Sequence, residues 1–277
     1  MRKRQNSKGN ILQKLFFEFS FGFPPPALYF AAPHPRTSKQ ATTARFQLKR
    51  IRFMKKKKNL TTQAIEDYLK TMYNLHSSAK KVSTSAIAER LHVAQASVTG
   101  MIKKLAEMKL VEYSPYQGVT LTEAGEKIAL EVIRHHRLLE LYLAEAMGYS
   151  WDKVHDEAEE LEHYISEEFE EKIDQFLGKP TLDPHGSPIP TKEGKLPELT
   201  CFALSEANPG ERVVVRRVSD RDPEKLRYLG KIGIYPQIQL LVLDKAPFNG
   251  PLHVQVQDSS HHLGHEISDS ILVDRVV

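Results

Sequence analysis

The sequence predicts a mainly α-helical protein with a small β domain: a winged helix-turn-helix, a helical domain and an SH3-like β-barrel. Apolar residues recur every three or four positions in the first two-thirds of the chain, which is the period of amphipathic helices. Residues 178–199 then contain five prolines and three glycines, typical of a linker or an ordered extended loop. Beyond them the apolar period becomes two, which is the period of strands. The expected divisions are 1–58, 59–122, 123–178, 179–199 and 200–277.

Length and composition restrict the class of protein. The 277 residues suffice for two compact domains. No run of eighteen or more apolar residues occurs, so we expect no transmembrane helix and no membrane partner. Cys201 is the only cysteine, which excludes a disulfide framework and a cysteine-based zinc site and fits a reducing cytoplasm.

The N-terminal segment differs in charge from the rest of the chain. Residues 1–58 hold 15 of the 39 lysines and arginines, whereas Glu18 is their only acidic residue. Glu18 and the triple proline at 24–26 disfavour a secretory signal. We therefore treat this segment as a disordered or mis-annotated extension, and we expect Met54 to be the natural start. The remainder carries 24 basic and 34 acidic side chains, a negative balance.

Residues 59–122 have the element order of a winged helix-turn-helix. Thr61 or Thr62 can cap a first helix. A short helix over 85–91, the turn HVAQ and a second helix over 96–108 follow, which is a helix-turn-helix pattern. The runs LVEYSP and GVTLT predict a hairpin, or wing; an αα-hairpin with an incidental ribbon is the alternative. The candidate DNA contacts are Gln95, Ser97, Thr99, Lys103, Lys104 and Tyr116, while Val98, Ile102 and Leu105 should face inward.

Residues 123–178 predict three helices. The first should run from Thr122 to about Met147 and end at Gly148. The second should cover 154–164 with Ser150 as its cap, and a short third should follow Ser166.

These helices carry a set of side chains that suits a metal ion. His136 and Glu140 are four residues apart, so both can reach one ion. The second helix adds two imidazoles and two carboxylates at steps of four, three and one. These residues are His155, Glu159, Glu162 and His163. The alternative is a solvated acidic face with two incidental histidines.

The C-terminal part has the pattern of a small barrel. RVVVRRVSD, QIQLLVLDKAP, LHVQVQD and SILVDRVV indicate strands, and DPEKLRYLGKIG indicates a single short helix. His261, His262 and His265 should lie in loops and not bind metal.

The order of several motifs resembles one known family. IEDYLKTMY, LTEAGEKIA, HHRLLELYL, KVHDEAEELEH and DPHGSPIP are similar to segments of the diphtheria-toxin-repressor family, and within it of the manganese-transport-regulator branch. The resemblance covers about residues 60–277. It implies a cytoplasmic homodimer that binds Mn²⁺, or Fe²⁺, and then represses metal-uptake genes on a palindromic double-stranded operator. It also implies that the β domain is FeoA-like.

The resemblance further implies two metal sites. The primary site would consist of Asp67, Glu159, Glu162 and His163, and the second of His136, Glu140, His155 and Asp222. Lys70 stands where some manganese regulators have a glutamate that supports a paired-metal site, so the arrangement with the second site is favoured. Oxygen-rich ligands with an imidazole suit Mn²⁺ and Fe²⁺.

Other classes of protein remain alternatives. A winged-helix regulator could sense an organic ligand, with the histidines and carboxylates in structural roles. A purely architectural DNA-binding protein would show no dependence on metal. A metallopeptidase is disfavoured because the motif H-x-x-E-H needs a histidine where the chain has Glu159, and H-E-x-x-H is absent. We therefore expect no enzyme.

Overall fold

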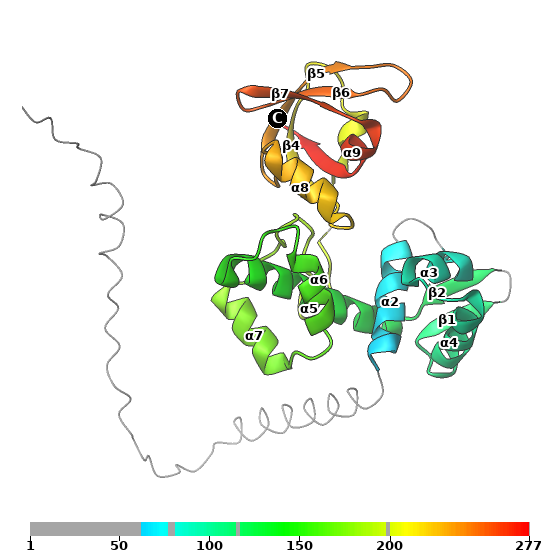
Figure 1. The fold of residues 1–277 in the computed structure, drawn as a ribbon. Coiled ribbons are helices and arrows are strands. Elements are labelled where there is room, and N and C mark those ends of the chain that lie inside the picture. Colours follow the sequence, from blue (N-terminus) through cyan, green and yellow to red (C-terminus); the bar gives the residue numbers. More distant parts are fainter. Residues whose placement is uncertain (1–61, 77–80, 115–116, 198–199, 277) are drawn as a thin grey trace, which may run out of the picture. The chain divides into compact units, whose positions relative to one another are not determined.

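The computed structural model describes residues 62–76, 81–114, 117–197 and 200–276 (Figure 1). The predicted N-terminal extension, the candidate cap Thr61 and the candidate DNA contact Tyr116 lie outside these residues. Within the described ranges, none of the helices combines the length and the apolar character that crossing a membrane requires.

The first domain is a winged helix-turn-helix, as predicted. Its apolar side chains form one core, in which Ile65 and Leu69 meet Ile87, Val98 and Ile102. The strands β1 and β2 pair antiparallel and form the wing. The elements are α2 (Gln63–His76), α3 (Thr84–Leu91), α4 (Gln95–Glu107), β1 (Val111–Ser114) and β2 (Gly118–Leu121).

Local capping explains the helix-turn-helix geometry. The Ser83 side chain accepts a hydrogen bond from the amide of Ala86 and so begins α3. His92 ends α3 in the left-handed region, at φ 54°. Val98, Ile102 and Leu105 are fully buried, which confirms the predicted inward face of α4.

The second domain contains three helices. They are α5 (Glu123–Met147), α6 (Val154–Leu161) and α7 (Glu167–Phe176). Thr122 caps α5 by accepting a hydrogen bond from the Gly125 amide, and Gly148 ends it at φ 71°, as predicted. Ser166 caps α7, also as predicted.

One predicted cap is wrong. Ser150 does not begin α6, because the chain first makes a turn over 151–153 in which the amide of Lys153 donates to the Ser150 carbonyl. Lys153 therefore takes the cap position, without a side-chain hydrogen bond. The helix also ends at Leu161, so that Glu162 and His163 lie on the turn that follows it.

The sequence predicts either a linker or an ordered extended loop for the proline-rich segment. The structure shows the ordered loop, and most of its central residues are buried. The Asp183 carboxylate accepts hydrogen bonds from the amides of His185 and Ser187 and closes a tight turn. Gly186 has φ 87°, and a Cβ there would lie 2.0 Å from the Arg216 carbonyl oxygen. Only glycine fits this close backbone approach.

The third domain is the predicted SH3-like β domain. Its antiparallel strands lie in the order β3-β8-β4-β5-β6-β7, and α8 covers their core with Leu226 and Leu229. Strand β6 buries every second residue, as its sequence period predicts. The elements are β3 (Phe202–Ala203), η1 (Leu204–Glu206), β4 (Arg212–Val218), α8 (Pro223–Lys231), β5 (Gln239–Lys245), β6 (Leu252–Val256), β7 (Ser259–Leu263), α9 (His265–Asp269) and β8 (Ile271–Arg275).

Two predictions for this domain are wrong. The sequence predicts a single helix here, but the domain contains η1 and α9 in addition to α8. The three histidines do not lie in loops, because His261 and His262 belong to β7 and His265 begins α9. The sequence of β7 lacks an apolar period, and its pairing with β6 makes it a strand. The His262 ring stacks there on His253, with centroids 4.1 Å apart.

Candidate metal centre

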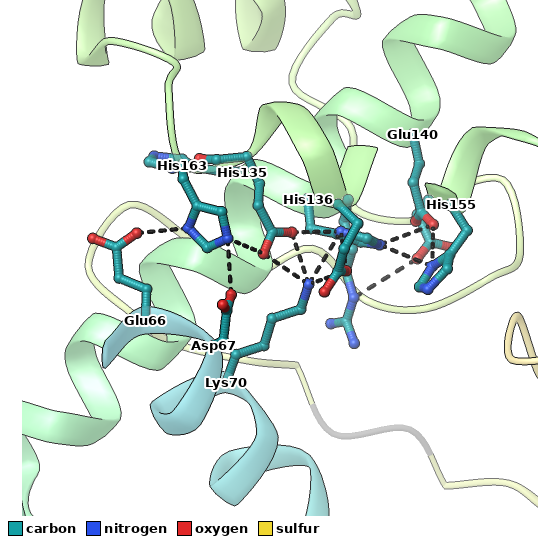
Figure 2. A network of polar contacts seen from close by, with 12 residues as sticks. Glu66, Asp67, Lys70, His135, His136, Glu140, His155 and His163 are labelled. Atoms are coloured by element: carbon teal, nitrogen blue, oxygen red, sulfur yellow. Dashed lines mark hydrogen bonds and ion pairs between the residues drawn. The ribbon is translucent and has the colours of Figure 1, made fainter. Parts of the chain in front are cut away.

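All of the predicted ligands except Asp222 lie where α2 faces α5, α6 and the turn after α6 (Figure 2). Helix α2 buries Ile65, Leu69 and Met72 in the core and turns its polar residues toward this junction. Helix α5 contributes His135, His136 and Glu140, and α2 contributes Glu66, Asp67 and Lys70 (Figure 2).

The first cluster joins α2 to the turn after α6. The Nε2 atom of His163 lies 2.9 Å from Oδ1 of Asp67 and 3.4 Å from Oε1 of Glu162. This nitrogen is buried and makes no aligned hydrogen bond, although Asp67 is close enough for an ion pair. The other ring nitrogen contacts Glu66 Oε2 at 2.7 Å. Sequence reasoning missed Glu66, whose only signal was its place next to Asp67.

The predicted primary set is not brought together as a whole. Asp67, Glu162 and His163 have ligand atoms within 4.8 Å of one another. Glu159 lies instead with His136 and Glu162, in a separate group with the same spacing. Its side chain is 47% exposed, whereas that of Glu162 is fully buried. Glu162 is therefore common to both groups.

The second cluster contains three of the four residues predicted for it. His136 Nε2 lies 3.1 Å from Glu140 Oε1 and 3.1 Å from His155 Nδ1. The fourth residue, Asp222, is not among them. Its carboxylate accepts hydrogen bonds from the amides of Glu224 and Lys225 and caps α8.

Asp220 lies where Asp222 was expected. Its carboxylate groups with Glu140 and His185, with ligand atoms within 4.8 Å. The imidazole of His185 is fully buried and contacts the Trp151 carbonyl through Nε2 at 2.7 Å. Its Nδ1 lies 3.8 Å from Glu140 Oε2, and neither of these two atoms has a hydrogen-bond partner. Sequence reasoning missed His185 and Asp220.

Neighbouring carboxylates favour the charged form of two imidazoles in the clusters, those of His163 and His136. Burial opposes the charge on His163, but the close carboxylates of Asp67 and Glu66 raise its pKa to about 10. Burial likewise opposes the charge on His136, whose pKa the neighbouring Glu140 raises to about 9. Each proton occupies a nitrogen that could bind a cation. Protons and a metal ion therefore compete for the same atoms.

Lys70 occupies the space between the two clusters (Figure 2). Its Nζ lies 2.7 Å from Glu159 Oε2, 2.9 Å and 2.7 Å from the two Glu162 oxygens, and 3.2 Å from His136 Nδ1. Burial alone would lower the pKa of Lys70, but the charges of Glu162 and Glu159 raise it above its usual value.

The donor atoms of these clusters fit a divalent cation. They are carboxylate oxygens and imidazole nitrogens, which suit Mn²⁺, Fe²⁺ and Zn²⁺. Ligands at about 2.0 to 2.2 Å from one ion lie at most about 4.4 Å apart, so the observed spacing needs only small adjustments. Buried atoms that lack hydrogen bonds, such as His163 Nε2 and Glu140 Oε2, would gain a partner.

The candidate DNA contacts lie on the outer side of α4. Ser97, Lys103 and Lys104 are exposed, as is Gln95 at the start of the helix. Thr99 is half-buried, and its hydroxyl donates to the Gln95 carbonyl at 3.0 Å. Four of these five side chains are thus free to reach a nucleic acid, while Thr99 already has a partner within its own helix.

Family models match almost all of the described chain. The iron dependent repressor N-terminal DNA binding domain matches residues 60–119. The iron dependent repressor metal binding and dimerisation domain matches residues 122–191. The FeoA domain matches residues 202–275.

Named relatives and solved structures agree with these matches. The chain is 30% identical over 230 residues to the iron-dependent repressor IdeR of Mycobacterium bovis, covering 79% of this chain and 100% of the relative. It is 30% identical over 211 residues to the diphtheria toxin repressor of Corynebacterium diphtheriae, covering 76% and 92%. A solved manganese-dependent transcriptional repressor in complex with manganese is 40% identical, with a TM-score of 0.72, covering 76% of this chain and 100% of that one.

Proposed function

Because the chain belongs to the diphtheria-toxin-repressor family, whose relatives include iron- and manganese-dependent repressors, we propose that it represses transcription in response to Mn²⁺ or Fe²⁺. It would bind a palindromic operator as a homodimer in the cytoplasm. The observation that carries the proposal is the junction in which Asp67 of the winged domain meets Glu162 and His163 of the helical domain. The named relatives are repressors, not enzymes.

The residues that would hold metal follow from the two clusters. Asp67, Glu162 and His163 would form the first site, with Glu159 as the adjacent carboxylate. The second site would use the three clustered residues of α5 and α6. We propose Asp220, and not Asp222, as the acidic residue of the β domain there, because Asp220 groups with Glu140 and Asp222 caps α8. The three clustered residues that α5 and α6 contribute to this second site are His136, Glu140 and His155.

The chain's own residues explain how such a site would control DNA binding. Asp67 lies on α2, which packs in the same core as α4. Glu162 and His163 follow α6, which packs on α5. A bound divalent cation supplies positive charge and a cross-link between these carboxylates and imidazoles. Fixing Asp67 against Glu162 would fix α4 relative to the helical domain, which lowers the cost of placing two recognition helices on two half-sites.

The test of the function is a titration of operator affinity with metal. Fluorescence anisotropy of DNA taken from upstream of metal-transport genes would be measured at rising free Mn²⁺ or Fe²⁺, anaerobically. We expect affinity to rise about 5- to 150-fold, the usual range of such coupling, and DNA to tighten metal binding by the same factor. DNA affinity that is independent of metal would contradict the proposal and favour an architectural protein.

The outer side of α4 gives a second prediction. We expect Lys103→Ala to weaken all DNA sequences alike and to lower the slope of log affinity against log salt by about one, because Lys103 would contact phosphate. Ser97→Ala should change sequence preference instead, since a recognition helix reads bases from its N-terminal part. Glu107→Ala, at the exposed C-terminal end of α4, is the control. Unchanged slope and preference in both variants would show that another element docks on DNA.

A further inference from the structure

The β domain carries a pair of histidines that strand pairing brings together. The strands β5, β6 and β7 are neighbours at one end of the sheet (Figure 1). His253 of β6 lies directly opposite His262 of β7, and the two rings stack with their centroids 4.1 Å and their planes 14° apart. Within the described residues, neither ring takes part in a hydrogen bond or an ion pair. Both rings therefore keep nitrogens that could bind a ligand.

The alternation of β6 places this pair on the face of the sheet opposite the core. Leu252 and Val254 are buried in the core, so His253 between them points the other way. Residues directly opposite each other on antiparallel strands share a face, which puts the exposed His262 beside His253. His261, the chain neighbour of His262, pairs with Val254 and lies on the core side.

We propose that His253 and His262 form a two-histidine binding site for a late first-row divalent cation, Ni²⁺, Cu²⁺ or Zn²⁺. The inference does not depend on the proposed function, because these two residues belong to none of the ligand clusters at the α2 junction. The expectation that His262 binds no metal rested on a position in a loop. Its pairing with β6 gives it a second imidazole as a neighbour, which a loop position would not.

The chemistry of the pair selects the ion. Imidazole nitrogens suit Ni²⁺, Cu²⁺ and Zn²⁺, whereas Mn²⁺ prefers carboxylates and water. Two nitrogens that bind one ion at about 2.0 to 2.1 Å lie about 3 to 3.5 Å apart. Directly opposed strand residues have Cβ atoms about 4.5 to 5.5 Å apart. Both rings can thus reach one ion once they turn their lone pairs toward each other, and no hydrogen bond with a described residue opposes that rotation.

A carboxylate continues the row on the next strand. Asp244 of β5 lies directly opposite His253, so Asp244, His253 and His262 follow one another across the sheet on one face. The Asp244 Oδ1 accepts a hydrogen bond from the Lys245 amide at 2.8 Å, which leaves Oδ2 to face a cation. Among the described residues these three side chains do not form a group with the spacing of metal ligands. Asp244 would therefore attract the cation, and water would complete the coordination beside the two imidazoles.

A bound ion would join an edge strand of the sheet to its neighbour. Among the described strands, β7 pairs with β6 alone, and its sequence lacks an apolar period. An ion that binds only the folded pair stabilises it by mass action. Part of the rise in unfolding temperature with Zn²⁺ should therefore come from this site, and that part should be absent from His262→Ala.

The test uses Cu²⁺ carried by nitrilotriacetate, a chelator that leaves adjacent positions on the ion open. This bulky complex can bind an exposed pair of histidines but does not fit the junction clusters, where His136 and Glu162 are buried. The full chain is titrated with the complex and followed by pulsed electron paramagnetic resonance, which counts the imidazoles bound to Cu²⁺. We expect the wild type to show two.

The variants assign the signal to the pair. His253→Ala and His262→Ala should each lose the two-imidazole signal, whereas His265→Ala, at the exposed start of α9, should retain it. Equilibrium dialysis with Zn²⁺ alone should give one more bound ion per protomer for the wild type than for His262→Ala. This comparison removes the contribution of the junction, which is the same in both proteins.

Three results would overturn the inference. They are a wild-type spectrum with one imidazole or none, a two-imidazole signal that persists in either alanine variant of the pair, and equal Zn²⁺ content in the wild type and His262→Ala. None of these readouts involves operator binding, so the proposed function stands or falls separately. If circular dichroism shows that an alanine variant does not fold, His253→Asn and His262→Asn keep a polar side chain and are compared in the same way.

Discussion

Replacing Asp67 by alanine will remove the metal response of operator binding and leave the winged domain folded. Asp67 is the α2 carboxylate whose oxygen groups with those of Glu162 and the ring nitrogen of His163, so its loss leaves that group without its α2 member. Glu66, also on α2, contacts the other ring nitrogen of His163 and remains in place. We expect the whole metal-induced gain in affinity, about 5- to 150-fold, to disappear. The Asp67 side chain is 30% exposed, so stability should change little.

The measurement is anisotropy of labelled operator DNA with and without Mn²⁺, alongside circular dichroism. Glu160→Ala is the matched control, because Glu160 is an exposed carboxylate on α6 outside the ligand clusters described. A full metal response in Asp67→Ala would place the controlling site elsewhere. Loss of the response in both variants would point to a general effect of negative charge.

Arg134→Met will destabilise the helical domain by about 3 to 5 kcal/mol, the usual cost of removing one partner from a buried ion pair. Arg134 Nε lies 2.6 Å from Glu170 Oε1, and Nη2 lies 2.9 Å from Asp174 Oδ1. Its Nη1 donates to the Pro190 carbonyl at 2.9 Å. One buried guanidinium thus joins α5, α7 and the proline-rich loop. Methionine at this position would leave the Glu170 and Asp174 carboxylates and the Pro190 carbonyl without the guanidinium as a partner.

Urea unfolding followed by circular dichroism gives the loss of stability. Lys192→Met is the control, since Lys192 pairs with Glu171 at 3.7 Å on the surface. An exposed pair of this kind contributes about 0 to 1 kcal/mol. If Arg134→Met lowered the free energy of unfolding by less than about 1 kcal/mol, the ion pairs of Arg134 would not be what holds the domain together.

The ion pair of Arg134 and Glu170 also contributes to the stability of the fold at acid pH. Burial opposes the charge of Glu170, but His135 and Arg134 lower its pKa to about 2. Since the folded pKa lies below the ordinary value of 4.5, the pair's contribution is complete above about pH 4.5. It is lost as the pH falls toward 2, and in Arg134→Met this loss should be smaller.

The sequence by itself determined the longer helices and the residues that share a face of each. Helical periods predict α2, α4 and α5, and the cap Thr122 and the terminator Gly148 lie where expected. The pair His136 and Glu140 also followed from spacing, because four residues bring two side chains to one helix face. These features depend only on residues close together in the chain, so the sequence is enough to predict them.

Only the tertiary structure decided which side chains from different elements meet. Lys70 and Glu162 are 92 residues apart, and no period indicates that they touch. The choice between Asp220 and Asp222 depends on where β4 ends and α8 begins, since the residue that caps α8 uses its carboxylate there. The physical reason is that contacts across the junction are set by the packing of buried faces against one another. Spacing along one helix orders its own side chains and leaves their partners undetermined.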